Sequence, residues 1–114
     1  MEINKARKII GNKLIGITCH NSIKLAKRAI ENNANYIAFG AFYPTKTKKP
    51  LHKSNIKILK RAKELTNIPI VAIGGINLNN YSKLLLNNAD FLAISGYIWK
   101  NKVYKPIEAI ESLK

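Results

Sequence analysis

The sequence predicts an α/β fold in which four strand–helix units follow one another in a single domain, residues 1–114. Three observations lead to this prediction. Four short apolar runs lack any alternation with polar residues, as is typical of parallel strands that are covered on both faces. Amphipathic stretches with helical spacing lie between these runs. Glycine, serine and threonine follow several of the runs, where a parallel sheet places its binding loops.

The four expected strands cover residues 14–18, 36–39, 69–73 and 91–94. The longer step between the second and the third strand reflects a loop over residues 40–54. Each expected helix begins after a residue that can cap it and carries one apolar face.

The first expected helix follows Asn21 or Ser22, the second follows Ser54, and the third follows Asn77. A last short helix begins at Pro106, because proline suits the first helical turn. No linker or low-complexity segment interrupts the four units. The chain therefore has the pattern of a continuous parallel sheet with alternating helices.

The net charge of +14 suggests a nucleic-acid partner, since lysine and arginine neutralise phosphates. Lysine, however, supplies 17 of the 20 basic residues, and it accompanies abundant asparagine and isoleucine, which share AT-rich codons with it. The densest basic run, residues 46–63, contains one arginine and no aromatic residue on which a base could stack. We therefore expect no nucleic-acid partner.

The composition also predicts a cytoplasmic protein without membrane contact. No apolar run reaches the length of a membrane span, and the N-terminus lacks a secretory pattern. The single cysteine, Cys19, excludes an internal disulfide and suits a reducing compartment, and we interpret it as a packing residue. Asp90 precedes an expected strand, so we expect it to be structural, at the end of the sheet opposite the binding loops.

Four parallel strand–helix units occur in a doubly wound sheet or as part of a (β/α)8 barrel, and the glycines favour the barrel. A dinucleotide-binding sheet places a glycine-rich turn after its first strand, and no such turn or P-loop is present. Gly74 and Gly75 instead follow the third strand, and Ser95 and Gly96 follow the fourth. Barrels often bind phosphate with the loops after strands seven and eight. If the chain supplies strands five to eight, these two loops fall at that place.

Four segments carry a resemblance to a known family. They are GITCH at residues 16–20, YIAFGAFYPTKTK at 36–48, PIVAIGGI at 69–76 and ADFLAISGYI at 89–98. With these segments the chain resembles the second, C-terminal half of thiamine phosphate synthase over almost its whole length. The resemblance implies a (β/α)8 barrel and a transferase that joins hydroxymethylpyrimidine diphosphate to thiazole phosphate and releases pyrophosphate with the help of Mg²⁺.

The resemblance also assigns roles to individual residues. Lys48 is expected to be catalytic, because it would contact the diphosphate of the pyrimidine substrate and stabilise the charge of the leaving pyrophosphate. Thr18 would contact the pyrimidine substrate. Thr45, Lys46 and Thr47 would contact the thiazole phosphate substrate. Gly75 would offer its N–H to the phosphate of that substrate, as would the loop at Ser95 and Gly96.

Two departures accompany the resemblance. Ala41 stands where the family has a loop proline. The family's first four strands, with the acidic ligands of Mg²⁺, have no counterpart in this sequence, so we expect the metal ligands in that missing N-terminal half. The chain alone is then expected to be inactive and to associate, as a homo-oligomer or otherwise, through the open edges of its sheet.

Two alternative functions remain open. A thiazole tautomerase of the same superfamily is similar in sequence and uses a histidine at the position of His20, although a lone histidine near a strand end is more often structural. Residues 44–48 favour the synthase, because the tautomerase replaces this segment. The third hypothesis is a non-catalytic module that binds phosphate or polyanions, which steeply salt-dependent binding to duplex DNA would support.

Overall fold

The computed structural model describes residues 3–11, 13–43 and 55–113 of the chain. Its centre is a sheet of four parallel strands in the order β1-β2-β3-β4. Each strand pairs with the next one along the chain, as neighbouring strands of a (β/α)8 barrel do. The strands are β1 (Gly16–Thr18), β2 (Tyr36–Phe39), β3 (Ile70–Ile73) and β4 (Phe91–Ala93).

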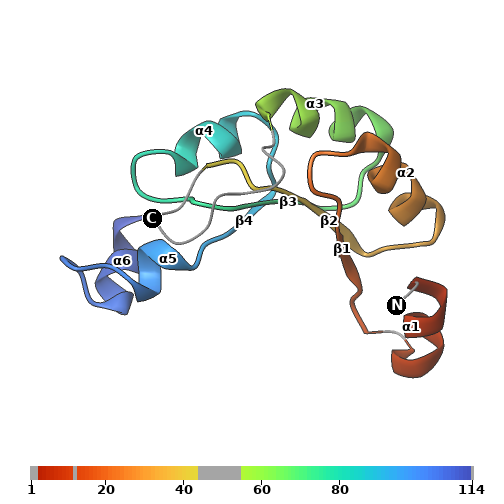
Figure 1. The fold of residues 1–114 in the computed structure, drawn as a ribbon, viewed down its shortest axis with the longest axis horizontal. Helices are drawn as coiled ribbons and strands as arrows, with labels where there is room; N and C mark the ends of the chain where they lie inside the picture. The colour runs from red at the N-terminus through yellow and green to blue at the C-terminus, as the bar shows by residue number, and fades with distance from the viewer. Residues whose placement is uncertain (1–2, 12, 44–54, 114) are drawn as a thin grey trace.

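Helices cover one face of this sheet and flank its two ends (Figure 1). They are α1 (Ile3–Ile10), α2 (Ile23–Glu31), α3 (Ile56–Leu65), α4 (Tyr81–Leu86), α5 (Gly96–Trp99) and α6 (Pro106–Ser112). The layer over the face consists of α2, α3 and α4, whereas α1 lies at the β1 end and α5 and α6 lie at the β4 end (Figure 1). No helix in the described part of the chain combines the length and the apolar character that crossing a membrane requires.

The burial of the strand residues shows which face the helices cover. In the register of the sheet, Ile37 lies opposite Ile70 and Phe39 lies opposite Ala72, and all four residues are 0% exposed. These residues belong to the main hydrophobic core, which also takes in buried residues of α2, α3 and α4. Burial of each large apolar side chain contributes about 1.5–3 kcal/mol, so this face holds the fold together.

The alternate residues of the same strands face the other way, because successive side chains in a strand point to opposite faces of a sheet. On this second face Tyr36, Ile73 and Phe91 are 37%, 40% and 59% exposed. The described residues therefore leave it largely uncovered. The arrangement is a half barrel, with helices on the outside and the face that would line a barrel interior left open.

All four expected strands are present, and their parallel order confirms the predicted half barrel. The strands differ from the expected ranges only at their ends. β1 begins at Gly16 although the apolar run begins at Leu14, whose side chain is exposed. β3 begins one residue after Pro69, which has no N–H to donate to a ladder, and β4 ends one residue before Ile94.

The helix starts agree with the capping signals in two of four cases, and a third start differs by one residue. Ser22 caps α2, because its Oγ accepts a hydrogen bond from the Leu25 N–H (3.2 Å). The side chain of Asn55 caps α3, directly after the expected Ser54, which lies outside the described residues. Helix α6 begins at Pro106 as expected.

Helices α1 and α5 are not predicted by the sequence pattern. Helix α5 spans only four residues, too few to show helical spacing, and α1 precedes the first of the expected strand–helix units. The start expected for α4 is wrong by three residues. The Asn77 carbonyl accepts hydrogen bonds from the N–H groups of Asn80 (3.3 Å) and Tyr81 (3.0 Å), so residues 77–80 form a turn before the helix begins. This turn has consequences for the candidate site.

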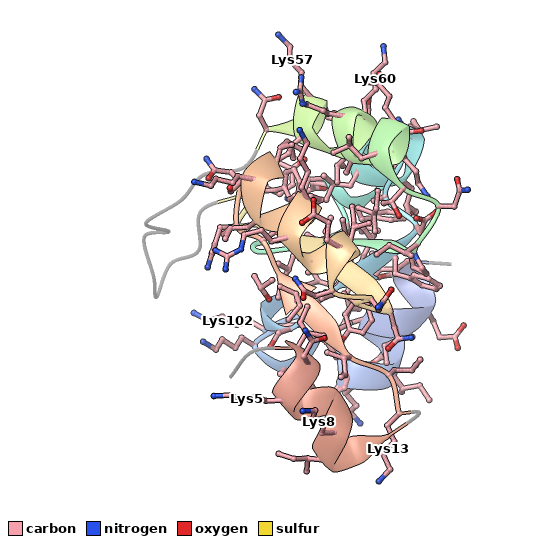
Figure 2. All side chains as sticks on the ribbon, turned by 90° about the vertical axis from the view of Figure 1, so that its right-hand side faces the viewer. Lys5, Lys8, Lys13, Lys57, Lys60 and Lys102 are labelled. Carbon is pink, nitrogen blue, oxygen red and sulfur yellow. The ribbon has the colours of Figure 1, made fainter. Side chains whose placement is uncertain are left out.

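The labelled lysines do not gather on one face. Lys57 and Lys60 project from α3 at one end of the molecule, whereas Lys5 and Lys8 project from α1 at the other end (Figure 2). A nucleic-acid surface generally concentrates its cations along one face or groove. The spread therefore favours the interpretation of the lysines as general surface charge, and the absence of a nucleic-acid partner stays a prediction.

Candidate active site at the carboxyl ends of the strands

The carboxyl ends of the four parallel strands lie along one edge of the sheet, and the described residues of the predicted site follow these ends. Thr18 is the last residue of β1, Gly75 follows β3, and Ser95 and Gly96 follow β4. The fold thus brings together residues from widely separated parts of the sequence. This confirms their placement at a common edge, whereas their contacts with substrates stay predictions.

The loop after β2 is tied to the loop after β3. The Phe42 N–H donates to the Ile73 carbonyl oxygen (3.2 Å), and the Tyr43 N–H donates to the Gly74 carbonyl oxygen (3.2 Å). The Phe42 side chain is also buried in the hydrophobic core, which anchors the loop after β2. The chain therefore stays hydrogen-bonded to β3 and its following loop beyond the end of β2, as far as Tyr43.

Four predicted site residues lie outside the described residues: Thr45, Lys46, Thr47 and Lys48. Their roles in binding and catalysis stay predictions. The described residue nearest to them in sequence is Tyr43, which is hydrogen-bonded beside Gly74.

The two glycines after β3 are required by the close approach of this neighbouring loop. Gly74 and Gly75 have φ angles of +105° and +64°, which residues with a Cβ rarely adopt. A Cβ at Gly74 would lie 2.5 Å from the Ala41 Cβ, and a Cβ at Gly75 would lie 2.5 Å from the Tyr43 carbonyl oxygen. Glycine is therefore needed at position 75 whether or not an anion binds there, a reason that the sequence pattern does not reveal.

A residue that sequence reasoning missed holds the same loop from its other side. The Asn80 side chain donates from Nδ2 to the Gly75 carbonyl oxygen (3.0 Å) and accepts at Oδ1 from the Asn77 N–H (2.8 Å). Asn77 in turn accepts the Asn79 N–H at its own Oδ1 (2.9 Å). The only signal in the sequence is a cluster of asparagines after a Gly-Gly pair, which also fits an ordinary turn.

The loop after β4 has an open surface. Ser95 occupies the N-cap position of the short helix α5 but makes no side-chain capping bond, and its carbonyl accepts the N–H groups of Ile98 (3.1 Å) and Trp99 (3.0 Å). Ser95 and Gly96 are both exposed, and a Cβ built on Gly96 would meet nothing within 4 Å. This loop therefore has room for a ligand.

At the end of β1, three consecutive residues lie in different environments. Thr18 is exposed, Cys19 is fully buried, and His20 is exposed with a φ of +53°. Burial raises the pKa of the Cys19 thiol to about 11, so the thiol stays protonated at neutral pH. This confirms Cys19 as a packing residue. The His20 carbonyl accepts the Gly40 N–H (3.0 Å), which ties the first loop to the second.

The opposite edge of the sheet holds Asp90, as the sequence predicted. Its carboxylate accepts the Ile70 N–H (2.9 Å) and forms an ion pair with Lys63 of α3. Burial alone would raise the pKa of Asp90, but the hydrogen bonds from Lys63 and Ile70 and the charge of Lys63 outweigh it and hold the pKa below its usual value. Asp90 therefore joins the starts of β3 and β4 to α3 and has a structural role.

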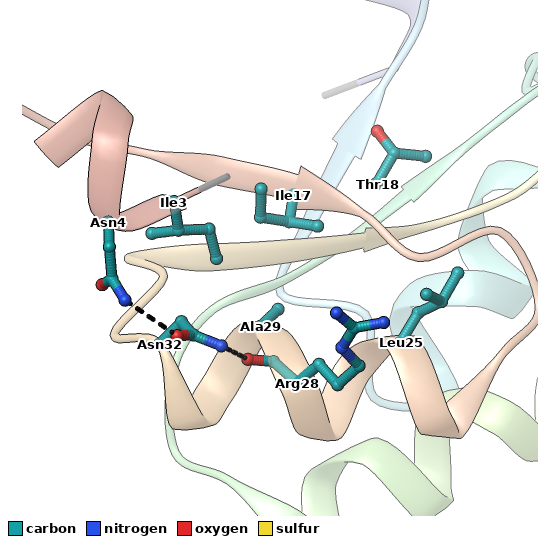
Figure 3. A pocket seen from close by; sticks show the side chains of 8 residues that line it. All are labelled: Ile3, Asn4, Ile17, Thr18, Leu25, Arg28, Ala29 and Asn32. Atoms are coloured by element: carbon teal, nitrogen blue, oxygen red, sulfur yellow. Dashed lines mark hydrogen bonds between the residues drawn. The ribbon is translucent and has the colours of Figure 1, made fainter. Parts of the chain in front are cut away.

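A cavity of about 350 Å³ lies at the β1 edge, between α1, β1 and α2 (Figure 3). Of the predicted site residues that the structure describes, Thr18 alone contributes to its lining. The side chains that line it are Ile3, Asn4, Ile17, Thr18, Leu25, Arg28, Ala29 and Asn32. Because a closed barrel has no free strand edge, we assign this space to the open edge of the half barrel rather than to the candidate site.

The residues available for a metal ion do not form a ligand set in the described part of the chain. Within those residues, no three side chains of histidine, cysteine, aspartate or glutamate come together. Mg²⁺ prefers several oxygen ligands, and these residues do not supply them. A Mg²⁺ site therefore stays an expectation based on the resemblance, and no step of a reaction is derived through it.

Taken together, the parallel half barrel and the joined loops at its carboxyl edge define a (β/α)8-barrel protein with its candidate active site in the usual place for that class. A protein-family model described as thiamine monophosphate synthase matches residues 1–98. The chain belongs to this family. The resemblance found in the four sequence segments is thereby confirmed.

Individual relatives agree with this assignment. The thiamine-phosphate synthase of Pelagibacter ubique is 64% identical over 114 residues, which cover 100% of this chain and 55% of that protein. The thiamine-phosphate synthase of Rhodospirillum centenum is 43% identical over 98 residues. The solved structure of thiamine phosphate pyrophosphorylase from Pyrococcus furiosus has a TM-score of 0.83 and 29% identity, and the match covers 99% of this chain and 52% of that one. The chain thus spans about half the length of the relatives it matches.

Proposed function

We propose that this chain forms the half of a thiamine phosphate synthase barrel that binds the thiazole phosphate substrate. The observation that carries the proposal is the pair of hydrogen bonds from Phe42 and Tyr43 to the backbone of Ile73 and Gly74. These bonds hold Phe42 and Tyr43, which directly precede the PTKTK segment in the sequence, beside the Gly-Gly loop, although the two loops lie far apart in the sequence. Two segments that carry the family resemblance are therefore neighbours at the edge where barrels bind substrates.

The proposed site binds the phosphate of the thiazole substrate mainly through backbone amides and hydroxyl groups. Gly75, Ser95 and Gly96 would offer N–H groups, and the TKTK segment would add hydroxyl groups and positive charge. The backbone geometry at Gly75 and the open surface at Gly96 support this assignment. Preorganised donors of this kind position a phosphorylated substrate without reorganisation during the reaction.

The chemistry of the proposed reaction requires stabilisation of a leaving pyrophosphate. Negative charge builds on this group as its bond to the pyrimidine substrate breaks, and Lys48 is proposed to stabilise that charge. Thr18 is proposed to contact the pyrimidine substrate from the end of β1. When bound, Mg²⁺ would neutralise part of the same charge, with ligands that we expect outside the described residues.

The tautomerase alternative rests on His20, which is exposed at the same edge of the sheet. The names of the relatives from Pelagibacter ubique and Rhodospirillum centenum favour the synthase instead. The polyanion-binding alternative rests on the net charge alone, and the spread of the labelled lysines over opposite ends does not support it. A cytoplasmic location is proposed with the synthase function and agrees with the single cysteine of the chain, Cys19, which is free and buried.

A binding experiment tests the proposal. We define the hybrid barrel as this chain joined to the part of the Pelagibacter ubique relative that it does not match. Calorimetric titration of the hybrid barrel with thiazole phosphate should show saturable binding to one site per molecule. Saturable binding of duplex DNA with a steep salt dependence, and no binding of thiazole phosphate, would support the polyanion module instead. Conversion of the thiazole by tautomerisation without thiamine phosphate formation would support the tautomerase.

A further inference from the structure

Asn80 occupies the N-cap position of α4, but its side chain does not cap that helix. N-cap asparagines ordinarily accept a hydrogen bond from an N–H in the first turn of their own helix. Here no side-chain capping bond is made, and the half-buried amide points back toward the loop after β3. Its hydrogen bonds are therefore used to fix the loop rather than the helix.

The Asn80 amide uses both of its ends on the backbone of this loop. Its Nδ2 donates to the Gly75 carbonyl oxygen (3.0 Å), and its Oδ1 accepts the Asn77 N–H (2.8 Å). The two partners bracket Ile76, which is buried in the core. One side chain thus fixes the orientation of the peptide groups on either side of a buried residue.

The same stretch is constrained from the opposite direction by the neighbouring loop. The Cα of Gly75 lies so close to Tyr43 that an added Cβ would be 2.5 Å from the Tyr43 carbonyl oxygen. Gly75 therefore lies between Tyr43 on one side and the Asn80 amide on the other. Backbone N–H and C=O groups of one peptide share a plane. The bond from Asn80 to the Gly75 carbonyl therefore fixes the Ile76 N–H, and the bond from the Tyr43 N–H to the Gly74 carbonyl fixes the Gly75 N–H.

We propose that Asn80 is a positioning residue, which fixes the backbone of residues 75–77 in the conformation that binds the phosphate of the thiazole substrate. This inference rests on the proposed function. Asn80 acts through the loop and is not proposed to touch the substrate. Without the Asn80 amide, the loop would have to become ordered when the ligand binds. The loss of one net hydrogen bond corresponds to roughly a tenfold loss of affinity.

The test compares Asn80→Ala and Asn80→Asp with Asn87→Ala in the hybrid barrel. Asn87 lies at the other end of α4, and its Nδ2 donates a hydrogen bond to the Lys83 carbonyl oxygen (2.7 Å). Asn87→Ala therefore removes a comparable hydrogen bond from side chain to backbone but does not affect the loop after β3. Asn80→Asp keeps an acceptor for the Asn77 N–H but loses the donor to Gly75. Calorimetry measures thiazole phosphate affinity, and amide hydrogen exchange follows the Asn77 N–H.

We expect Asn80→Ala to weaken thiazole phosphate binding about tenfold and to speed exchange of the Asn77 N–H. Asn80→Asp should weaken binding while leaving that N–H protected, and Asn87→Ala should leave both unchanged. If Asn80→Ala binds thiazole phosphate as well as the wild type does, the role of Asn80 is wrong. If the wild-type hybrid barrel binds no thiazole phosphate, the proposed function is wrong. If Asn80→Ala leaves the exchange rate of the Asn77 N–H unchanged, the positioning role of Asn80 is wrong, whatever the outcome for binding.

Discussion

The two glycines assigned to phosphate binding have different surroundings. At Gly75 a positive φ angle and the nearby Tyr43 carbonyl both require glycine. At Gly96 an added Cβ would meet no atom within 4 Å. A substitution at Gly75 therefore changes folding and binding together, whereas a substitution at Gly96 can separate the two.

We expect Gly75→Val to lower the free energy of unfolding of the hybrid barrel by about 2 kcal/mol or more, because backbone strain and the clash with Tyr43 add. Gly96→Val should stay within about 1 kcal/mol of the wild type. It should nevertheless weaken thiazole phosphate binding by roughly tenfold or more, if the phosphate approaches the Gly96 amide. Urea unfolding and calorimetry measure the two effects. Unchanged affinity in a stable Gly96→Val variant would remove Gly96 from the site.

Lys48 carries the catalytic prediction. Lys48→Ala in the hybrid barrel should lower turnover by roughly two orders of magnitude, the scale for loss of one group that stabilises transition-state charge. The KM for thiazole phosphate should change much less, because Lys48 is assigned to the other substrate. Steady-state kinetics with each substrate varied in turn measures both values. Turnover within a few-fold of the wild type would contradict the assigned role.

At the scale of whole elements, Asp90 shows how one side chain joins three of them. It connects the N–H of Ile70 at the start of β3, the start of β4 and Lys63 of α3. Because the pKa of Asp90 is lowered in the folded protein, its contribution to stability is complete above the unfolded-state pKa of about 4. The contribution is lost as the pH falls through the lower folded-state value.

We expect Asp90→Asn to cost about 1 kcal/mol at pH 7, since the ion pair is partly exposed and screened. Asp90→Ala should cost more, about 2 kcal/mol, because the Ile70 N–H then loses its acceptor as well. As the pH falls through the lowered folded-state pKa, the wild-type carboxyl becomes protonated, so the difference between wild type and Asp90→Asn should shrink. Urea unfolding of the hybrid barrel at pH 7 and at pH 3 tests this. A difference that grows as the pH falls would contradict the account.

The sequence could predict the elements whose signals are local. The four strands appear as continuous apolar runs, and Ser22 and Pro106 mark helix starts because capping acts within one turn. The start of α4 could not be predicted, since Asn77 and Asn80 are equally good caps by type. The choice depends on the Asn80 amide finding partners in the preceding loop. The contact of Tyr43 with Gly75 could not be predicted either, because it joins residues of different strand–helix units.

The molecule as a whole is a sheet with one covered face and one open face. Phe91 and Ile73 on the open face are 59% and 40% exposed, whereas Ile70 and Ala72 on the helix side are fully buried. Exposed apolar surface of this kind favours association, while the net charge of +14 makes copies of the chain repel one another. Salt screens the repulsion between copies, so self-association should strengthen as salt is added, whereas binding to a polyanion would weaken.

We therefore expect the 114-residue chain by itself to associate, and to associate more strongly as salt screens its positive charge. Size-exclusion chromatography with light scattering, at low and high salt, measures the effect. Phe91→Ser should reduce the association, because it removes the most exposed of the three large side chains named on the open face. A monomer at every salt concentration would show that the open face does not need covering.

The central claim is that this chain supplies one half of a thiamine phosphate synthase barrel. The most direct measurement is formation of thiamine phosphate from hydroxymethylpyrimidine diphosphate and thiazole phosphate, with Mg²⁺, by the hybrid barrel and by the chain alone. We expect turnover by the hybrid barrel within about tenfold of the Pelagibacter ubique relative, and none by the chain alone. A hybrid barrel that unfolds as cooperatively as the relative yet forms no thiamine phosphate would contradict the claim.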